Sequence, residues 1–257
     1  MRKVFMIGIV TSLFISCSDE NGNNQSPDDN TLLVQMTETV GSDSSTSTFE
    51  YNGNKIVSQT DDVKSISYEY TGNLITKRTF QAFDSPDHKS EQIYQYSADN
   101  QLSQVVELFY YGPNAPQGFK YVFTNNGDNT ISYNKYQGNL VNQDTYVGSG
   151  TYHFNVDGEV QQIVQNDINA VAVATINFTY DTHHAPFSNV VGYDKLFYIN
   201  DGKHRNIISI TTEVDDDALS TTHAYLYNAD DYPSDLEITF TENDGTPSTK
   251  TVEYFYN

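Results

Sequence analysis

The chain repeats a short pattern in which an aromatic residue, a glycine-asparagine pair and an aliphatic residue follow at fixed spacing. The copies cover residues 51–56 (YNGNKI), 70–75 (YTGNLI) and 136–141 (YQGNLV). A Gly-Asn pair is typical of a two-residue hairpin loop, because glycine accepts the positive φ of a type II′ turn. The pattern predicts structural turns at three pairs of positions: Gly53 and Asn54, Gly72 and Asn73, and Gly138 and Asn139.

Counting outward from each loop gives the expected strand register. Each aromatic residue should lie opposite the aliphatic one as a cross-strand pair on one face. The predicted pairs are Tyr51 with Ile56, Tyr70 with Ile75, and Tyr136 with Val141. Residues 154–160 (FNVDGEV) indicate a looser variant, a three-residue loop with Gly158 left-handed and Phe154 opposite Val160.

Aromatic residues also recur two positions apart, which places both rings on one face of a strand. These pairs are Tyr68/Tyr70, Tyr94/Tyr96, Tyr121/Phe123, Tyr152/Phe154, Phe178/Tyr180 and Tyr225/Tyr227. The residues between them are mostly polar, so one face of the predicted sheet should be aromatic and the other should be exposed to solvent. A transmembrane barrel needs the opposite, a continuous apolar outer band.

No segment after residue 30 sustains a helical apolar period, and short-spaced strands joined by hairpins are antiparallel. The sequence therefore predicts an all-β protein, an antiparallel meander of roughly sixteen strands from repeated hairpins. A sheet of that length has to curl to hide its aromatic face. The pattern leaves open whether it closes as a barrel, folds into a sandwich or stays a curved sheet.

The N-terminus has the features of a signal peptide, predicted over residues 1–16. Arg2 and Lys3 precede an apolar stretch that is too short to span a bilayer and ends at Cys17, the only cysteine. The sequence around it resembles a bacterial lipobox, which implies lipidation of Cys17 and a membrane anchor. The alternative is an ordinary secretory signal with a chance cysteine.

Residues 18–20 (SDE) resemble the acidic export signal of surface lipoproteins of the Bacteroidetes type; the alternative is a solvated linker. Residues 17–30 contain almost no apolar side chains and are expected to form a lipidated flexible tether. Residues 31–257 would then form a single β-repeat domain. The expected location is the outer membrane, lipid-anchored and exposed at the cell surface.

The later copies carry a further resemblance. Tyr180-Asp181 with Pro186-Phe187, and Tyr227-Asn228 with Tyr232-Pro233, are similar to the YD-type repeats of Rhs-like shells. They are more closely similar to Gram-negative lipoproteins built from degenerate copies of such repeats. The resemblance spans about residues 45 to 257. It implies a fold and a cellular location, and it implies no catalytic residues.

The remaining chemistry is sparse. The chain has 13 basic and 34 acidic residues, a formal charge of −21, which argues against a nucleic-acid partner. Gly148-Ser149-Gly150 lacks the elbow of an acyl-transfer enzyme, and His183 and His184 are adjacent, so they should point to opposite faces. We predict no catalytic residue, no metal site and no cofactor.

The sequence thus favours a non-enzymatic surface lipoprotein, a scaffold or binding module for a glycan, a peptide or an envelope protein, acting through loops on one edge. One alternative is an envelope polysaccharide hydrolase with paired carboxylates, about 5 to 9.5 Å apart. Another is a subunit of an outer-membrane assembly whose exposed strand edges pair with a partner.

Overall fold

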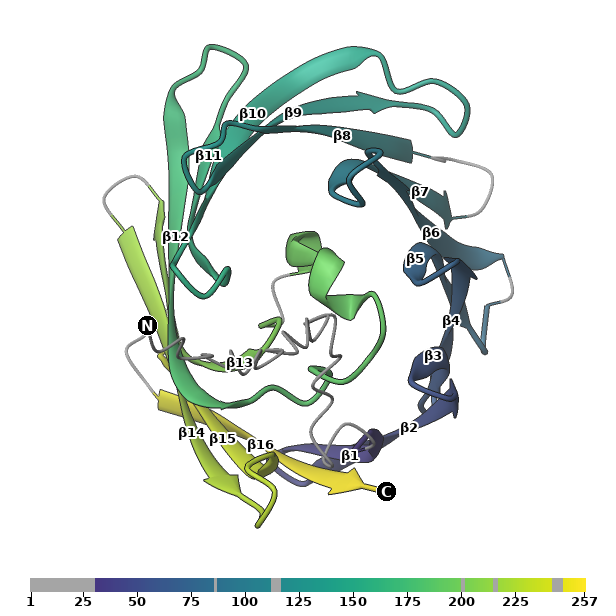
Figure 1. The fold of residues 1–257 in the computed structure, drawn as a ribbon, viewed down its shortest axis with the longest axis vertical. Coiled ribbons are helices and arrows are strands. Elements are labelled where there is room, and N and C mark those ends of the chain that lie inside the picture. The colour runs from purple at the N-terminus through teal and green to yellow at the C-terminus, as the bar shows by residue number, and fades with distance from the viewer. Residues whose placement is uncertain (1–30, 86, 112–116, 200–201, 215–216, 242–246) are drawn as a thin grey trace, which may run out of the picture.

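The computed structural model describes residues 31–257 except 86, 112–116, 200–201, 215–216 and 242–246. Sixteen antiparallel strands follow one another in chain order, and the first pairs with the last, so the sheet closes into a barrel (Figure 1). The predicted all-β antiparallel meander is confirmed, and its closure as a barrel answers the question that the pattern left open. Cys17 and the proposed signal peptide and tether lie outside the described residues.

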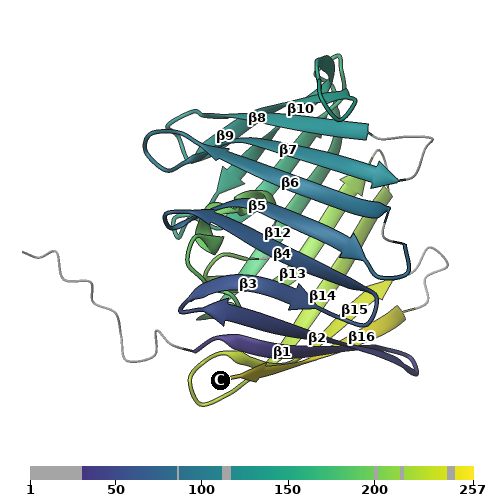
Figure 2. The same ribbon diagram turned by 90° about the vertical axis from the view of Figure 1, so that its right-hand side faces the viewer.

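The strands are tilted across the wall, as closure of a barrel requires (Figure 2). They are β1 (Leu33–Val40), β2 (Asp43–Asn52), β3 (Lys55–Thr60), β4 (Lys64–Thr71), β5 (Leu74–Ala82), β6 (His88–Tyr96), β7 (Leu102–Tyr111), β8 (Gln117–Asn125), β9 (Thr130–Gly138), β10 (Thr145–Phe154), β11 (Val160–Asn166), β12 (Ala172–His184), β13 (Arg205–Val214), β14 (Asp217–Tyr227), β15 (Pro233–Thr241) and β16 (Pro247–Tyr256).

Side chains alternate between the lumen and the outside along each strand. In β4, Ile66 and Tyr68 are buried, whereas Ser67 and Glu69 between and beside them are exposed. In each predicted aromatic pair from Tyr68/Tyr70 to Phe178/Tyr180, one ring is buried in the core cluster and the other is partly buried and packs against it. The aromatic face is therefore the inner face of the barrel, because rings that leave water must face the enclosed side.

Two of the three Gly-Asn hairpins form as predicted. Tyr51 pairs with Ile56 and Tyr70 with Ile75, around loops in which Gly53 and Gly72 both have a φ of 58°. The looser hairpin also forms, with Phe154 opposite Val160 and Gly158 at a φ of 82°.

The third prediction is wrong. Tyr136 pairs with Tyr146, and Val141 is 83% exposed in a loop after β9. The side chain of Asn139 accepts hydrogen bonds from the amides of Val141 (2.8 Å) and Asn142 (2.9 Å), which stabilises a wider connection than a two-residue turn. Tyr133 faces the lumen, so Tyr136, three positions further on, points outward.

Tyrosine hydroxyls tie neighbouring hairpins together inside the barrel. Tyr51 donates to the carbonyl of Leu33 at 2.8 Å, and Tyr96 donates to the carbonyl of Ile75 at 2.7 Å. Tyr180 and Tyr225 make the corresponding bonds to Val160 (2.7 Å) and Ile207 (3.1 Å). Each ring thus fills the core while its polar tip satisfies a buried carbonyl.

One connection departs from the hairpin repeat. Between β12 and β13 the chain turns into the barrel and forms two short 3₁₀ helices, η2 (Tyr193–Lys195) and η3 (Phe197–Ile199) (Figure 1). We call the described part of this connection, residues 185–199 and 202–204, the plug.

Candidate functional site: the plugged lumen

The plug sits on the two correctly predicted Gly-Asn turns. The amide of Val191 donates to the carbonyl of Asn54 at 2.9 Å. Gly192 has a φ of 79°, and a Cβ there would lie 2.4 Å from the carbonyl oxygen of Asn73. The turns that connect the strands are therefore also docking points for the segment that fills the barrel end.

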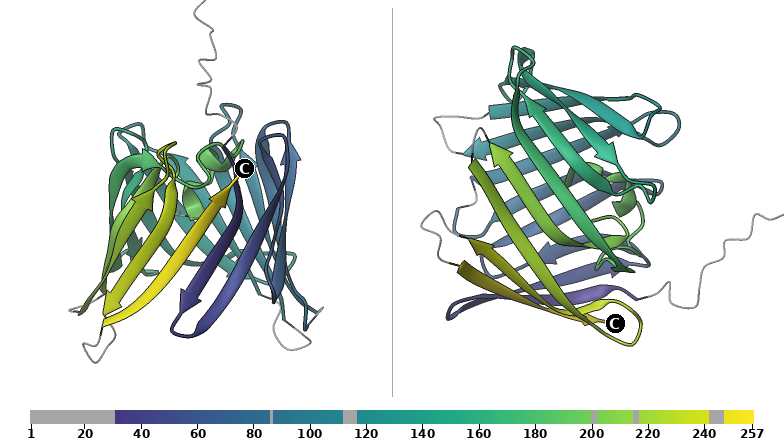
Figure 3. Two further views of the ribbon diagram at one scale, coloured as in Figure 1. Left: turned by 90° about the horizontal axis from the view of Figure 1, so that it is seen from below. Right: turned by 90° about the vertical axis from the view of Figure 1, so that its left-hand side faces the viewer.

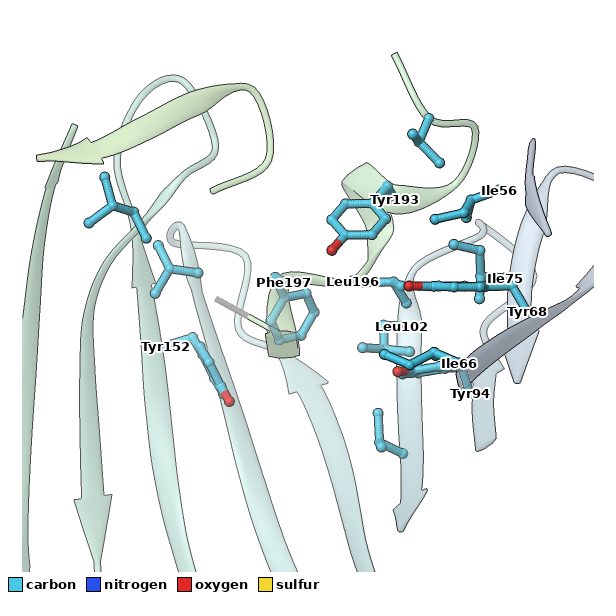
Figure 4. Close-up of a cluster of buried hydrophobic side chains, with 14 of the residues drawn as sticks. Ile56, Ile66, Tyr68, Ile75, Tyr94, Leu102, Tyr152, Tyr193, Leu196 and Phe197 are labelled. Atoms are coloured by element: carbon cyan, nitrogen blue, oxygen red, sulfur yellow. The ribbon is translucent and has the colours of Figure 1, made fainter. Parts of the chain in front are cut away.

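Aromatic packing fixes the plug inside the wall. Phe187 lies edge-on to Phe49, with ring centroids 5.5 Å apart. Phe197 lies edge-on to Phe123 (5.2 Å) and to Tyr152 (5.1 Å). Figure 4 shows Tyr193, Leu196 and Phe197 of the plug directed toward wall residues such as Ile75, Leu102 and Tyr152.

Two carboxylates, the buried Glu159 and the half-buried Asp181, hold the chain where it enters and leaves the plug. Glu159, only 1% exposed, accepts hydrogen bonds from three consecutive amides, those of Lys203 (2.9 Å), His204 (2.7 Å) and Arg205 (3.1 Å). Asp181 accepts from the amides of His183 and Asn206 and from the hydroxyl of Tyr227. The Tyr-Asp pair at 180–181 therefore has a structural role at the plug.

The plug fills part of the end of the barrel where the described chain begins and finishes. Leu32 and Asn257 exchange two hydrogen bonds there, of 2.8 and 3.1 Å. Figure 3 (left) shows the plug helices and the C-terminus at the same end. The opposite end carries the connections between β1 and β2, β3 and β4, and so on around the barrel, and we call it the open end.

A hollow of about 470 Å³ lies between the plug and the open end, beside β8 to β12. Tyr198 and Ile199 of η3 form part of its lining, and Asp167, in the β11–β12 turn, marks its outer limit. We call it the Lys135 hollow. Its lining includes Gln92, Tyr121, Tyr133, Lys135, Ser149, Tyr152, Gln165 and Asn166.

Lys135 projects from β9 into this hollow. Its Nζ lies 4.7 Å from the ring centroid of Phe119 and 5.3 Å from that of Tyr121, and such contacts are weakly stabilising. No ion pair found among the described residues involves Lys135. The carboxylate of Asp167 accepts hydrogen bonds from the amides of Asn169 and Val171 and so stabilises its own turn.

Two tyrosine hydroxyls at the hollow, those of Tyr133 and Tyr198, have raised pKa values and stay protonated over the physiological pH range. Burial raises the pKa of Tyr133 to about 12. Burial, and then the carboxylate of Glu107, also raise the pKa of Tyr198. Glu107 itself accepts a hydrogen bond from Gln92 at 2.9 Å, and Gln92 accepts one from Tyr94 at 2.7 Å.

A second hollow, of about 380 Å³, lies on the other side of the plug and is called the Arg78 hollow. Arg78 is only 7% exposed, and its guanidinium carbon lies 5.5 and 5.0 Å from the ring centroids of Tyr68 and Phe80. Phe187 and Tyr193 of the plug line the same hollow. Both hollows thus combine one cation with aromatic walls in a strongly acidic protein.

The paired carboxylates of a glycosidase are not found in these hollows. Within the described part of the chain, Asp167 is the single acidic residue that lines the Lys135 hollow, and none lines the Arg78 hollow. No grouping of three His, Cys, Asp or Glu suited to a metal ion occurs among the described residues.

The two adjacent histidines considered from the sequence lie at the plugged end, and the serine lies at the Lys135 hollow. The ring of His183 stacks on Tyr227 (3.8 Å), and that of His184 stacks on Tyr232 (4.9 Å), both at the plugged end. Ser149 lies at the Lys135 hollow, where Asn166 donates to its hydroxyl at 3.5 Å.

The outer face of the wall is predominantly polar. Large apolar side chains exposed on strands are separated from one another; they include Val57, Ile208, Leu226 and Phe255. Near β6, Glu91 accepts hydrogen bonds from Lys89 (2.7 Å), Lys77 (3.0 Å) and Tyr110 (3.0 Å). Burial opposes its ionisation, but these bonds outweigh burial and lower the pKa of Glu91 to about 2.

No helix among the described residues is long and apolar enough to cross a membrane. No protein-family model matches the sequence, and no curated protein is significantly similar to it. Its similarity to the lipoprotein and YD-type repeat families therefore stays a prediction.

Among solved structures, the chain is similar to a porin-like protein from Bacteroides vulgatus, with a TM-score of 0.57 and 14% identity over 88% of this chain and 99% of that one. A porin-like protein from Bacteroides uniformis matches with a TM-score of 0.43 and 12% identity, over 90% and 98% of the two chains. The first similarity shows the fold: this chain has the barrel architecture of the B. vulgatus porin-like protein.

Proposed function

We propose that this chain is a non-enzymatic envelope lipoprotein of the outer membrane, and that its lumen binds a glycan or another envelope ligand. The observation that carries the proposal is the arrangement of the wall: polar outside, aromatic inside, and partly filled by the plug at one end. A wall of this kind stands in water, because a membrane-spanning barrel places its apolar band outside.

The position of the chain ends gives the barrel an orientation. Leu33 begins β1 at the plugged end, so a tether over residues 17–30 would join the barrel there. The plugged end then faces the membrane, and the open end faces away from it. Ligand enters the lumen from that open end, whereas the sequence alone favoured binding through edge loops.

Two alternatives have less support. The lining of the hollows favours binding over hydrolysis, since the described residues supply no pair of acids there. Closure of the barrel by β1 and β16 removes the free strand edges on which strand pairing with a partner would depend. The edge-pairing hypothesis is therefore wrong for the described barrel.

The anchor is tested by Cys17→Ala. This variant should move from the membrane fraction to the soluble fraction, because the attached acyl chains supply the membrane affinity. If the variant still sediments with membranes after a salt wash, the assignment of Cys17 as the membrane anchor is wrong.

Binding in the lumen is tested on a glycan array with Gln165→Trp. Gln165 faces the lumen between Gly150 and Ala174, both small, so an indole there fills the Lys135 hollow. Gln161→Trp, at an exposed position of the same strand, is the control. Loss of glycan signal in the first variant alone is expected; equal signals from both variants contradict lumen binding.

A further inference from the structure

The Lys135 hollow contains an ammonium group for which the described residues supply no ion-pair partner. The ammonium group points into a cavity lined by residues of β6, β8 to β12 and η3, rather than into water around the outer wall. Two acidic residues lie near this cavity: Asp167 accepts hydrogen bonds within its own turn, and Glu107 accepts one from Gln92 and keeps its negative charge, but neither forms an ion pair with Lys135. A cation kept on the inner face, in a chain with a formal charge of −21, favours an anionic ligand at that position.

Lys120, on the neighbouring strand, differs from Lys135 in facing the outside of the barrel. Its Nζ is 5.1 Å from the ring of Tyr136 on the outer face. There it pairs with Asp144 at 3.5 Å. The two lysines thus have similar ring contacts on opposite faces of the wall, and the ion pair is on the outer one.

The walls around Lys135 fit a saccharide. Ring faces such as that of Tyr121 suit the C–H faces of a pyranose, and the side chains of Gln92 and Gln165 offer donors and acceptors for hydroxyl groups. A volume of about 470 Å³ lies within the usual range of small-molecule sites. A peptide lacks its commonest way of binding a sheet, because the closed barrel has no free strand edge.

We propose that the Lys135 hollow binds an acidic saccharide, with a sugar carboxylate against Nζ of Lys135 and the sugar ring against the surrounding tyrosines. This inference rests on the proposed function and narrows it to carboxylated glycans. One ammonium group balances one carboxylate, and enclosure by η3 and the wall reduces the solvent screening of that pair.

The test is calorimetric titration of the purified full-length protein in detergent with trimers of galacturonate, glucuronate and mannuronate and with their neutral hexose counterparts. At least one uronate trimer should bind about tenfold or more tightly than its neutral counterpart. Lys135→Gln should weaken that uronate about tenfold or more, because it removes one partner of an enclosed charge pair. Lys120→Gln, the matched control, should bind like the wild type.

The other results separate the possible errors. If no uronate binds, or if Lys135→Gln binds the uronate like the wild type, the acidic-saccharide proposal is overturned. If neutral trimers bind equally well and Gln165→Trp abolishes that binding, the lumen function stands and its acidic specificity is wrong. A tetraglutamate peptide that binds more tightly than every uronate, with the same dependence on Lys135, overturns the saccharide class.

Discussion

Replacement of Glu159 by alanine should loosen the plug and destabilise the whole barrel. The carboxylate accepts three amide hydrogen bonds and is almost fully buried, so its loss leaves three enclosed amides without an acceptor. Hydrogen bonds to a charged group contribute about 1.5 to 3 kcal/mol each, but bonds that share one acceptor are not additive. We expect a loss of about 3 to 5 kcal/mol in the free energy of unfolding.

The assay is urea denaturation combined with hydrogen exchange of the plug amides. A barrel of this size should lose roughly 10 °C in Tm for such a change. Glu159→Gln keeps one carbonyl oxygen and should lose about half as much. Glu50→Ala is the control, because Glu50 is exposed on the outer face and hydrogen-bonds with Ser58. If Glu159→Ala is as stable as Glu50→Ala, and the amide of His204 stays protected, these three bonds do not secure the plug.

Three further changes test the wall. Glu91→Gln should flatten the acid branch of the stability profile. The pKa of Glu91 is about 2 in the folded protein and about 4.3 in the unfolded chain, which corresponds to about 3 kcal/mol of stability above pH 4.3 that is lost as the pH falls toward 2. Identical profiles for variant and wild type would contradict the network. Tyr96→Phe should cost about 1 kcal/mol in chemical denaturation by removing the bond to Ile75, and an unchanged midpoint would show that the bond contributes nothing. Gly72→Val should lower Tm, because a β-branched residue resists a φ of 58°; an unaltered melting curve would count against the turn.

Local sequence determines the hairpins and which face of each strand is buried. Tyr70 and Ile75 are only a few residues apart, so turn chemistry alone sets their register. The copy at Tyr136 shows the limit of such local prediction. The same aromatic-x-Gly-Asn motif occurs there at the other end of the barrel, where Asn139 stabilises a wider loop. A motif of two turn residues does not encode which strand end it occupies.

Closure and the plug depend on contacts between distant parts of the chain. The pairing of β1 with β16 is not marked by any local pattern, and Glu159 is one of 34 acidic residues, so nothing singles it out before the fold is known. Lys135 could have been found from the sequence. It stands two positions after Tyr133 and so interrupts the aromatic face, as Arg78 does before Phe80.

The pairing of the first and last strands also constrains how the chain reaches its final form. As the chain folds, the barrel cannot close until β16 is available, so β1 lacks its second neighbour while the other hairpins assemble. With Leu32 and Asn257 already hydrogen-bonded, a short peptide could join the termini, and new ends could be cut at any exposed tip of the open end. Such circular permutants would keep the same wall while changing which strand is last to close it.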